Sequence, residues 1–376
     1  MRAISGDFHF YADPITKSRH WIFEPRGLSA VINYFNIDAE TTSLLIQAHS
    51  ALGRLEGISR YVPHMDYLED MIIRHEACVS CAVDNLLCTP ATMLRSEINT
   101  VGKSCAVNLF RAVKDFGIQS LSIQLFCKLH EVVMKDAVWG TSGRIRTQIF
   151  LMYPYFHADM EDYNPPLPER LNDLLKDLIA FSKTEGKTDI LIKAALIYYQ
   201  FETIHPFECG NGLIGRLLPN MILMKEKVLS RPILPLSNYF YQNEEECERQ
   251  FTNNQHFGKY KDWVKFFLQG IIMSAELAIR QIDMANSLRE ENLKGIMLLE
   301  KSASVLSSLC DYLEQKPIIS VQESADFLSV SYNTATKYVK IMEELEILKQ
   351  VNEQSRYRIF SYDRYVKMFD THLGGA

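Results

Sequence analysis

A chain of 376 residues has room for two or three domains with buried cores. Its 47% hydrophobic and 23% charged residues are typical of a soluble globular protein, and its net charge of −6 gives no indication of a polyanion-binding protein. No apolar run reaches the roughly 18 residues of a membrane helix, and the first residues lack the apolar core of a secretory signal. We therefore expect a cytoplasmic protein without membrane contact.

The spacing of apolar residues predicts helices along most of the chain. Residues 1–40 are irregular and rich in aromatic residues, and from Ala39 apolar residues recur at i, i+3/i+4 and i+7, as on one face of a helix. Gly57 and Pro63 end the first of these segments. Further helices are predicted over about 65–87, 101–116, 119–133, 169–184, 189–204 and 210–225, and helical sequence continues to about 295, including 260–289.

Residues 138–166 interrupt this helical pattern. Trp139–Gly143 has the composition of a turn, and residues 144–152 alternate polar and apolar side chains, which predicts a short strand or hairpin. Pro165, Pro166 and Pro168 then end the segment.

The last 87 residues, 290–376, predict a different kind of domain. Three short helices are predicted over 306–314, 321–328 and 331–345, and two strand-like segments, 347–351 and 357–362, flank a polar turn at 352–356. Three helices followed by a two-stranded wing describe a winged helix, which could bind DNA through residues 331–358. Residues 302–376 carry 8 Lys/Arg against 10 Asp/Glu, however, so a protein-contact or spacer role is favoured.

Chemistry is best indicated by the loop between the helices predicted over 189–204 and 210–225. Gly210-Asn211-Gly212 lets the backbone turn tightly and approach a ligand, and the helix that begins there would offer free N–H groups to a phosphate. His205 could remove a proton from a hydroxyl beside that phosphate, and Arg216 could return to it as a fork of donors. A plain helix–loop–helix with a solvated arginine fits the same residues, and the residues alone leave both interpretations open.

The loop resembles the Fic motif, HPFx(D/E)GNGRxxR, with His205-Pro-Phe207-x-x-Gly210-Asn211-Gly212-x-x-x-Arg216. The similarity continues through nearly the whole chain, including the N-terminal helical domain and the C-terminal winged helix found in many bacterial Fic proteins. The flanking segments that also resemble the family are Ala51–Gly57, Pro63, Arg74–Ala77, Tyr198–Ile204 and Leu229–Tyr239.

This resemblance implies a mostly α fold: a helical Fic core with a short β-hairpin flap, an N-terminal helical domain and a C-terminal winged helix. We place the three domains at residues 1–100, 101–290 and 291–376. It also implies an enzyme, a protein adenylyltransferase that moves AMP from ATP to a Ser, Thr or Tyr hydroxyl of a target protein. The target would dock by strand pairing at the flap, about residues 143–152.

Family roles carry over to individual residues in the same way. His205 would be the general base, and Phe207 would anchor the loop in the core. The residues expected to bind nucleotide and phosphate are Gly210, Asn211, Gly212, Gly215, Arg216 and Tyr239.

Two motif positions depart from the family. Cys209 stands where the family has the Asp or Glu that holds Mg²⁺, and a thiol is a poor ligand for this hard cation, so no residue is assigned to a metal. Leu213 replaces the first motif arginine, which removes one phosphate contact. The loss of one such contact typically lowers a rate by about 10²–10³. We expect weak or lost activity.

Many Fic proteins also carry an inhibitory helix with the pattern (S/T)xxxE(G/N). Here Ser80, Asp84 and Asn85 match it, with aspartate in place of glutamate. By resemblance, Asp84 would pair with Arg216 and prevent productive placement of the terminal phosphate; the alternative is an ordinary polar residue near a helix end.

Three hypotheses follow. The first is a self-inhibited adenylyltransferase; the second is a catalytically impaired Fic-fold regulator whose winged helix binds DNA; the third is a Fic enzyme with another nucleotide donor. A second copy of the chain is a further candidate partner.

Overall fold

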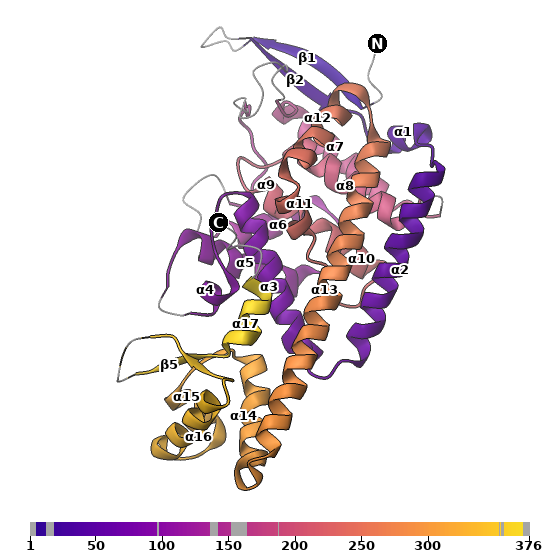
Figure 1. The fold of residues 1–376 in the computed structure, drawn as a ribbon. Helices are drawn as coiled ribbons and strands as arrows, with labels where there is room; N and C mark the ends of the chain where they lie inside the picture. The colour runs from indigo at the N-terminus through magenta and orange to yellow at the C-terminus, as the bar shows by residue number, and fades with distance from the viewer. Residues whose placement is uncertain are drawn as a thin grey trace.

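The computed structural model describes residues 5–12, 19–95, 98–135, 142–151, 164–186, 188–352, 354 and 357–370. One long helix, α13 (Tyr260–Met297), runs through most of the molecule, and α2 (Ala39–Tyr61) lies along it (Figure 1). Over the described ranges, no helix has both the length and the apolar content that crossing a membrane requires.

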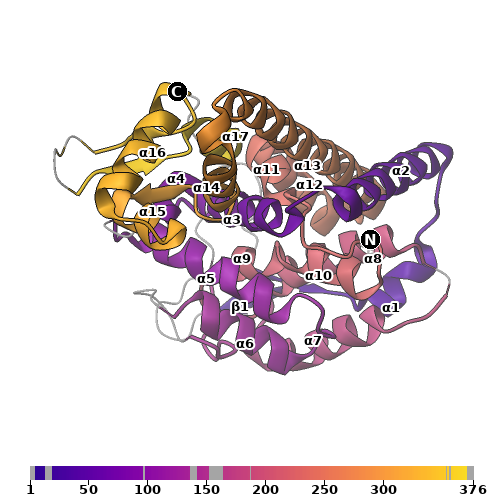
Figure 2. The same ribbon diagram turned by 90° about the horizontal axis from the view of Figure 1, so that it is seen from below.

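The N-terminal helices begin at polar residues that cap them. Asp38 accepts a hydrogen bond from the Thr41 N–H at 2.8 Å at the start of α2. Helix α3 (Met65–Val83) follows, and it is buried along most of its length. Figure 2 shows α3 between α13 and the helices that surround the glycine-rich loop. The remaining helices up to residue 182 are α1 (Leu28–Val31), the 3₁₀ turn η1 (Ile32–Tyr34), α4 (Pro90–Leu94), α5 (Val101–Phe116), α6 (Ile123–Val133) and α7 (Pro168–Ser182).

Helix α8 (Ile190–Ile204) is the centre of the core. Nearly all of its side chains are buried, so its sequence reads as an apolar run and not as an amphipathic stripe. Trp263 of α13 donates a hydrogen bond to the Ala195 carbonyl at 2.8 Å, which fixes α8 against the long helix. His205 follows directly after the C-terminal end of α8. The helices that follow are α9 (Asn211–Gly215), α10 (Leu218–Lys225), α11 (Leu236–Gln242) and α12 (Glu244–Phe257).

Two local expectations are corrected by the structure. The first 40 residues contain an antiparallel hairpin, β1 (Gly6–Ala12) and β2 (Arg19–Pro25), where no strand is predicted. Conversely, the hairpin predicted at 144–152 has no strand within 144–151, and Met152 lies outside the described residues. In this segment the Arg146 N–H bonds to the Pro206 carbonyl at 2.9 Å, so its backbone pairs with the loop after α8.

The helix predicted over 210–225 is broken into α9 and α10. Pro219 lies in the first turn of α10 and has no N–H to donate to the Gly215 carbonyl, so the i→i−4 ladder cannot continue through this point. Arg216 sits at the break, at the end of α9.

After α13 the elements are η2 (Glu300–Ser302), α14 (Ala303–Gln315), β3 (Ile318–Ser320), α15 (Val321–Leu328), α16 (Tyr332–Glu344), β4 (Lys349–Gln350), β5 (Ile359–Ser361) and α17 (Asp363–Asp370). The three strands form an antiparallel sheet in the order β3-β5-β4. The winged-helix interpretation of these elements stays a prediction. Helix α17 was not predicted; it returns to the N-terminal helices, where the Phe369 carbonyl lies 2.6 Å from Nδ1 of His75 (Figure 1).

The proposed division at 1–100, 101–290 and 291–376 stays a prediction. Helix α13 runs without a break through residues 290 and 291, and Arg364 forms a bidentate ion pair with Glu291 at 2.7 and 2.8 Å. The C-terminal elements are therefore joined to the core by a continuous helix and by side-chain contacts.

Candidate active site

His205 ends α8 in the left-handed conformation, with φ 48°, and its N–H bonds to the Phe201 carbonyl at 3.1 Å. Few non-glycine residues adopt this conformation, and it turns the chain sharply out of the helix. Phe207 then enters the core, where it is fully buried and stacks on the His130 ring at a centroid distance of 4.0 Å. Phe207 is therefore buried beneath the loop, and its role as an anchor stays a prediction.

The Asn211 side chain braces this loop. Its Oδ1 accepts from the Phe207 N–H and its Nδ2 donates to the Phe207 carbonyl, both at 2.9 Å. The amide is therefore committed to the loop backbone. Gly210 has φ 70°, and a Cβ there would lie 2.7 Å from Sδ of Met134, so this position requires glycine.

Two residues that the sequence analysis missed hold the loop from the other side. His130 donates from Nε2 to the Cys209 carbonyl and accepts at Nδ1 from the Gly143 N–H, both at 2.9 Å. Arg146 donates from Nε to the His205 carbonyl at 2.8 Å. Their partners are backbone groups distant in sequence, which no local pattern reveals.

The His205 ring is in a state suited to accepting a proton. Desolvation and the nearby positive charge of Arg146 lower the pKa of His205 to about 4. The imidazole is therefore neutral at pH 7. The Phe150 ring lies 5.0 Å from it, centroid to centroid.

Arg216 is held by the end of α3. Its Nε donates to Oγ of Ser80 at 2.8 Å, and its Nη2 donates to the Ser80 carbonyl at 2.9 Å and to Oδ1 of Asp84 at 3.0 Å. Burial disfavours the charged guanidinium, but Asp84 outweighs burial and raises the pKa of Arg216 above its usual value. Three residues predicted from distant parts of the sequence therefore meet here.

Gly212 lies beside this contact. A Cβ at Gly212 would be 2.6 Å from Nη1 of Arg216 and 3.1 Å from Oδ1 of Asp84. The absent side chain is thus what lets Asp84 reach the arginine across the glycine loop.

Comparison with known proteins agrees with this geometry. Residues 120–223 match the Fic/DOC family, and residues 42–113 match the Fic/DOC family N-terminal domain. The chain therefore carries a Fic/DOC domain preceded by a Fic/DOC N-terminal domain.

Its relatives and structural neighbours include three informative cases. A probable protein adenylyltransferase of Aquifex aeolicus is 23% identical over 316 residues, 81% of this chain and 90% of that protein. A protein adenylyltransferase Fic of Nematostella vectensis is 30% identical over 149 residues, which span 38% of this chain and only 32% of that protein. The crystal structure of a Fic family protein from Desulfovibrio desulfuricans shares the fold, with a TM-score of 0.56 and 18% identity over 87% of this chain and 97% of the other.

The two residues that differ from the Fic motif, Cys209 and Leu213, have different surroundings. Burial and the neighbouring Glu208 raise the pKa of the Cys209 thiol, so it is protonated at neutral pH. In the ranges that the structure describes, no group of three or more His, Cys, Asp or Glu side chains could hold a metal ion. At the position where the family has its Mg²⁺ ligand, Cys209 presents a protonated thiol, which does not suit this hard cation. Leu213 is 1% exposed and contributes an apolar side chain to the core.

A buried carboxylate not anticipated from the sequence faces the Fic loop from α8. Glu202 lies so close to Gly215 that a Cβ there would come within 1.9 Å of its Oε1. Burial raises the pKa of Glu202 to about 7, although the charge of Arg216 opposes this. Gly215 thus makes room for a carboxyl group beside Arg216.

The other predicted residues are placed as follows. Tyr239 is on α11, 9% exposed, and its ring packs on Phe266 at 5.0 Å between centroids. Asn85 follows α3 with φ 59°, so the backbone turns away from the helix directly after Asp84. Of the flap segment 143–152, the structure describes residues 143–151.

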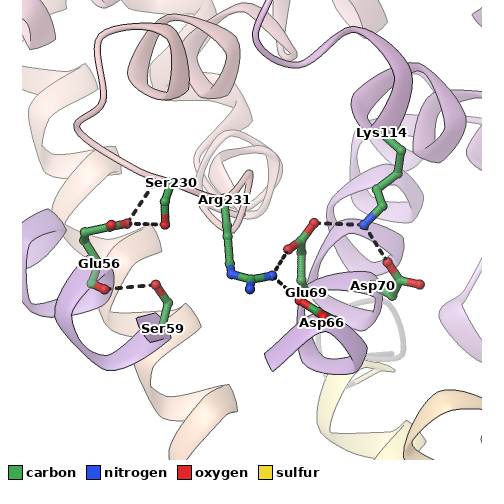
Figure 3. Close-up of polar contacts among 8 residues, drawn as sticks. All are labelled: Glu56, Ser59, Asp66, Glu69, Asp70, Lys114, Ser230 and Arg231. Atoms are coloured by element: carbon green, nitrogen blue, oxygen red, sulfur yellow. Dashed lines mark hydrogen bonds and ion pairs between the residues drawn. The ribbon is translucent and has the colours of Figure 1, made fainter. Parts of the chain in front are cut away.

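Ion pairs anchor α3 at its opposite end. Figure 3 shows Arg231 paired with both Asp66 and Glu69 of α3, with Lys114 of α5 on the far side of Glu69. Nearer the middle of α3, Glu76 accepts a hydrogen bond from Oγ of Ser237 at 2.6 Å. Helix α3 is therefore fixed along its length before it reaches Arg216.

Proposed function

We propose that the chain is a protein adenylyltransferase that transfers AMP from ATP to a Ser, Thr or Tyr hydroxyl of a target protein and is held in check by α3. The names of the Aquifex and Nematostella relatives and the Fic/DOC match over the loop support this function. The observation that carries the inhibited state is the binding of Arg216 by Ser80 and Asp84.

The proposed reaction uses His205 as the base. The target hydroxyl oxygen attacks the α-phosphorus of ATP, its proton passes to the neutral imidazole, and pyrophosphate leaves. The backbone of Gly210–Gly212 holds phosphate oxygens, while the Asn211 side chain keeps the loop in shape through Phe207. The terminal phosphate would bind Arg216, a bidentate donor suited to phosphate.

Inhibition follows from competition for Arg216. Three donor–acceptor contacts direct its guanidinium toward α3, and a terminal phosphate that bound Arg216 would have to displace Asp84. ATP would bind with its terminal phosphate displaced from this arginine. Asp84 is 30% exposed and Arg216 only 5%, so the aspartate is the partner able to move away.

The second candidate function is a Fic-fold regulator with impaired catalysis. It is favoured by the buried apolar side chain of Leu213, which gives no donor to a phosphate, and by the protonated thiol of Cys209. DNA would then be bound through 331–358. The use of another nucleotide donor, target docking at 143–152, association with a second copy and a cytoplasmic location also stay proposals.

The deciding experiment is self-labelling with α-³²P-ATP in a Cys209→Asp background. Asp84→Gly removes one charge-assisted hydrogen bond, so labelling should rise about tenfold or more. Asp84→Glu, which restores the longer side chain, should keep labelling at or below the parent level.

His205→Ala serves as the control and should abolish labelling in every background. Calorimetry with ADP should show that all variants still bind nucleotide. Labelling that is unchanged by Asp84→Gly but abolished by His205→Ala would remove the inhibitory role from α3. Labelling that survives His205→Ala would remove the proposed base.

A further inference from the structure

We propose that Arg146 is a positioning residue for the reaction, because it lies in the proposed flap segment, 143–152, and bonds to the backbone of His205 and of Pro166. The proposal rests on the proposed role of His205 as the base. Arg146 would not touch substrate; it would set where the base stands and make that position depend on the flap.

One buried guanidinium contacts three segments of the chain. Arg146 is 2% exposed; its Nε donates to the His205 carbonyl at 2.8 Å, its Nη2 to the Pro166 carbonyl at 2.6 Å, and its Nη1 to the Gln148 carbonyl at 3.2 Å. Its own N–H donates to the Pro206 carbonyl at 2.9 Å. Two of these contacts hold the carbonyls of consecutive residues, His205 and Pro206.

The backbone at His205 and Pro206 needs hydrogen-bond donors from another part of the chain. His205 stands in a left-handed conformation that side-chain-bearing residues rarely adopt, and Pro206 after it has no N–H. The carbonyls at the end of α8 cannot be satisfied within the helix. Arg146 supplies the donor that the His205 carbonyl lacks, so the backbone that carries the imidazole is fixed.

The same side chain also contacts the proposed flap itself. Gln148 lies inside the flap segment 143–152 and Pro166 lies after it in the chain, and both present carbonyls to Arg146. A target segment that docks at 143–152 would contact the segment that carries Arg146. Docking and the placement of His205 are thereby coupled through a single guanidinium.

Arg146 also acts on the ring through its charge. Desolvation is the larger cause of the lowered pKa of His205, and the Arg146 charge adds to it, while the backbone carbonyl of Glu202 opposes both. Burial and this charge together keep the imidazole unprotonated at neutral pH.

The chain offers a matched control two residues away. Arg144 is exposed on the same segment, so Arg144→Gln removes the same functional group without touching the His205 carbonyl. Arg146→Gln removes the charge and the fork, whereas Arg146→Lys keeps the charge and loses the fork.

The first measurement needs no activity. In full-length protein with ¹³C-labelled histidine, assigned by loss of the signal in His205→Ala, the His205 titration midpoint should rise by at least one pH unit in Arg146→Gln. It should stay near the parent value in Arg146→Lys and Arg144→Gln. A midpoint that is the same in Arg146→Gln and the parent would overturn the electrostatic part of the proposal.

The second measurement uses labelling in the Asp84→Gly, Cys209→Asp background. Loss of positioning should lower kcat about 10²-fold in Arg146→Gln, with ADP affinity unchanged. Arg146→Lys should be lowered as well, despite its normal titration, since it cannot span three carbonyls. Full kcat in both Arg146 variants would overturn the positioning role. If the background itself labels nothing, the proposed function fails, while the titration still decides the electrostatic part.

Discussion

At the scale of single residues, the two departures from the Fic motif have different surroundings. Cys209 is half-buried, and its backbone carbonyl is already held by His130, so a new side chain there keeps the loop geometry. Leu213 is packed in the core, where a charged side chain has no room unless its end reaches a phosphate. The two positions should therefore respond differently to restoration of the family residue.

Cys209→Asp should raise metal-dependent self-labelling by about 10²-fold, because it supplies a hard oxygen ligand in place of a protonated thiol. Leu213→Arg alone should lower the melting temperature, since it places a charge in an apolar site. Labelling in Mg²⁺ and thermal unfolding without nucleotide measure the two effects. A Cys209→Asp protein that labels no better than the parent would show that the missing metal ligand is not the defect.

Buried carboxylates near α3 should make stability depend on pH. Burial raises the pKa of Glu76 to about 7 from 4.5, despite hydrogen bonds from Ser237. Between these two values the folded state binds more protons than the unfolded state, so the free energy of unfolding should fall as pH rises from 4.5 to 7. Glu202, also raised to about 7, adds to this slope.

Glu76→Gln should reduce that slope by up to about 1.4 kcal/mol per pH unit, because an amide takes up no proton in this pH range. The neutral amide can still accept a hydrogen bond from Ser237, so the local contact is kept. Urea unfolding at pH 5, 6, 7 and 8 measures it. Glu290→Gln, at a side chain 73% exposed, is the control and should leave the slope unchanged. Equal slopes in Glu76→Gln and the parent would contradict the assigned proton uptake.

At the scale of elements, α13 is joined to α14 by a partly buried ion pair. Arg289 lies 2.7 Å from Oε2 of Glu314 and 2.5 Å from Oδ1 of Asp311, and Glu314 is only 9% exposed. This contact joins α14 to the long helix, beside which it lies in Figure 1.

Arg289→Met should lower the free energy of unfolding by about 3 kcal/mol, because it leaves Glu314 buried without its counter-charge. The double variant Arg289→Met, Glu314→Met should recover most of this loss. Arg364→Met breaks an exposed pair with Glu291 and should cost no more than about 1 kcal/mol. Urea unfolding compares the three. If Arg289→Met and Arg364→Met cost the same, burial of the Arg289 pair has no energetic consequence.

At the scale of the whole molecule, α3 lies between the Fic core and the C-terminal elements (Figure 2). It contacts Arg216 through Ser80 and Asp84, and α17 through His75. A partner that binds the C-terminal elements would thus act close to the helix that holds Arg216.

DNA is the partner that charge argues against. With 8 basic and 10 acidic residues over 302–376, we expect no binding of a random 20-bp duplex tighter than about 10 µM at 150 mM salt. Fluorescence anisotropy measures it, with Lys337→Ala, Lys340→Ala as the comparison. Binding near or below 1 µM that weakens in this variant would favour the regulator hypothesis.

The sequence by itself determined the helical elements and the chemistry-bearing loop. The helices near 39, 101, 190 and 260 begin within a residue or two of the predicted positions, because apolar spacing and capping residues are local signals. One short segment contains His205, Phe207, the glycines and Arg216, so their motif can be recognised from the sequence without knowledge of the fold. The hairpin β1–β2 was missed because polar and apolar residues alternate only weakly along its strands, and because the register of each strand depends on its partner.

Only the tertiary structure decided which distant groups meet at that loop. Asp84 and Arg216 are 132 residues apart, and their contact was expected by family resemblance alone. Arg146 and His130 bond to backbone carbonyls. Every residue has the same carbonyl group, so the sequence does not indicate which carbonyl a distant side chain will contact. Long-range pairing is set by how helices pack, and packing is a property of the whole chain, so these contacts become visible only once α3, α6 and α8 are assembled around the loop.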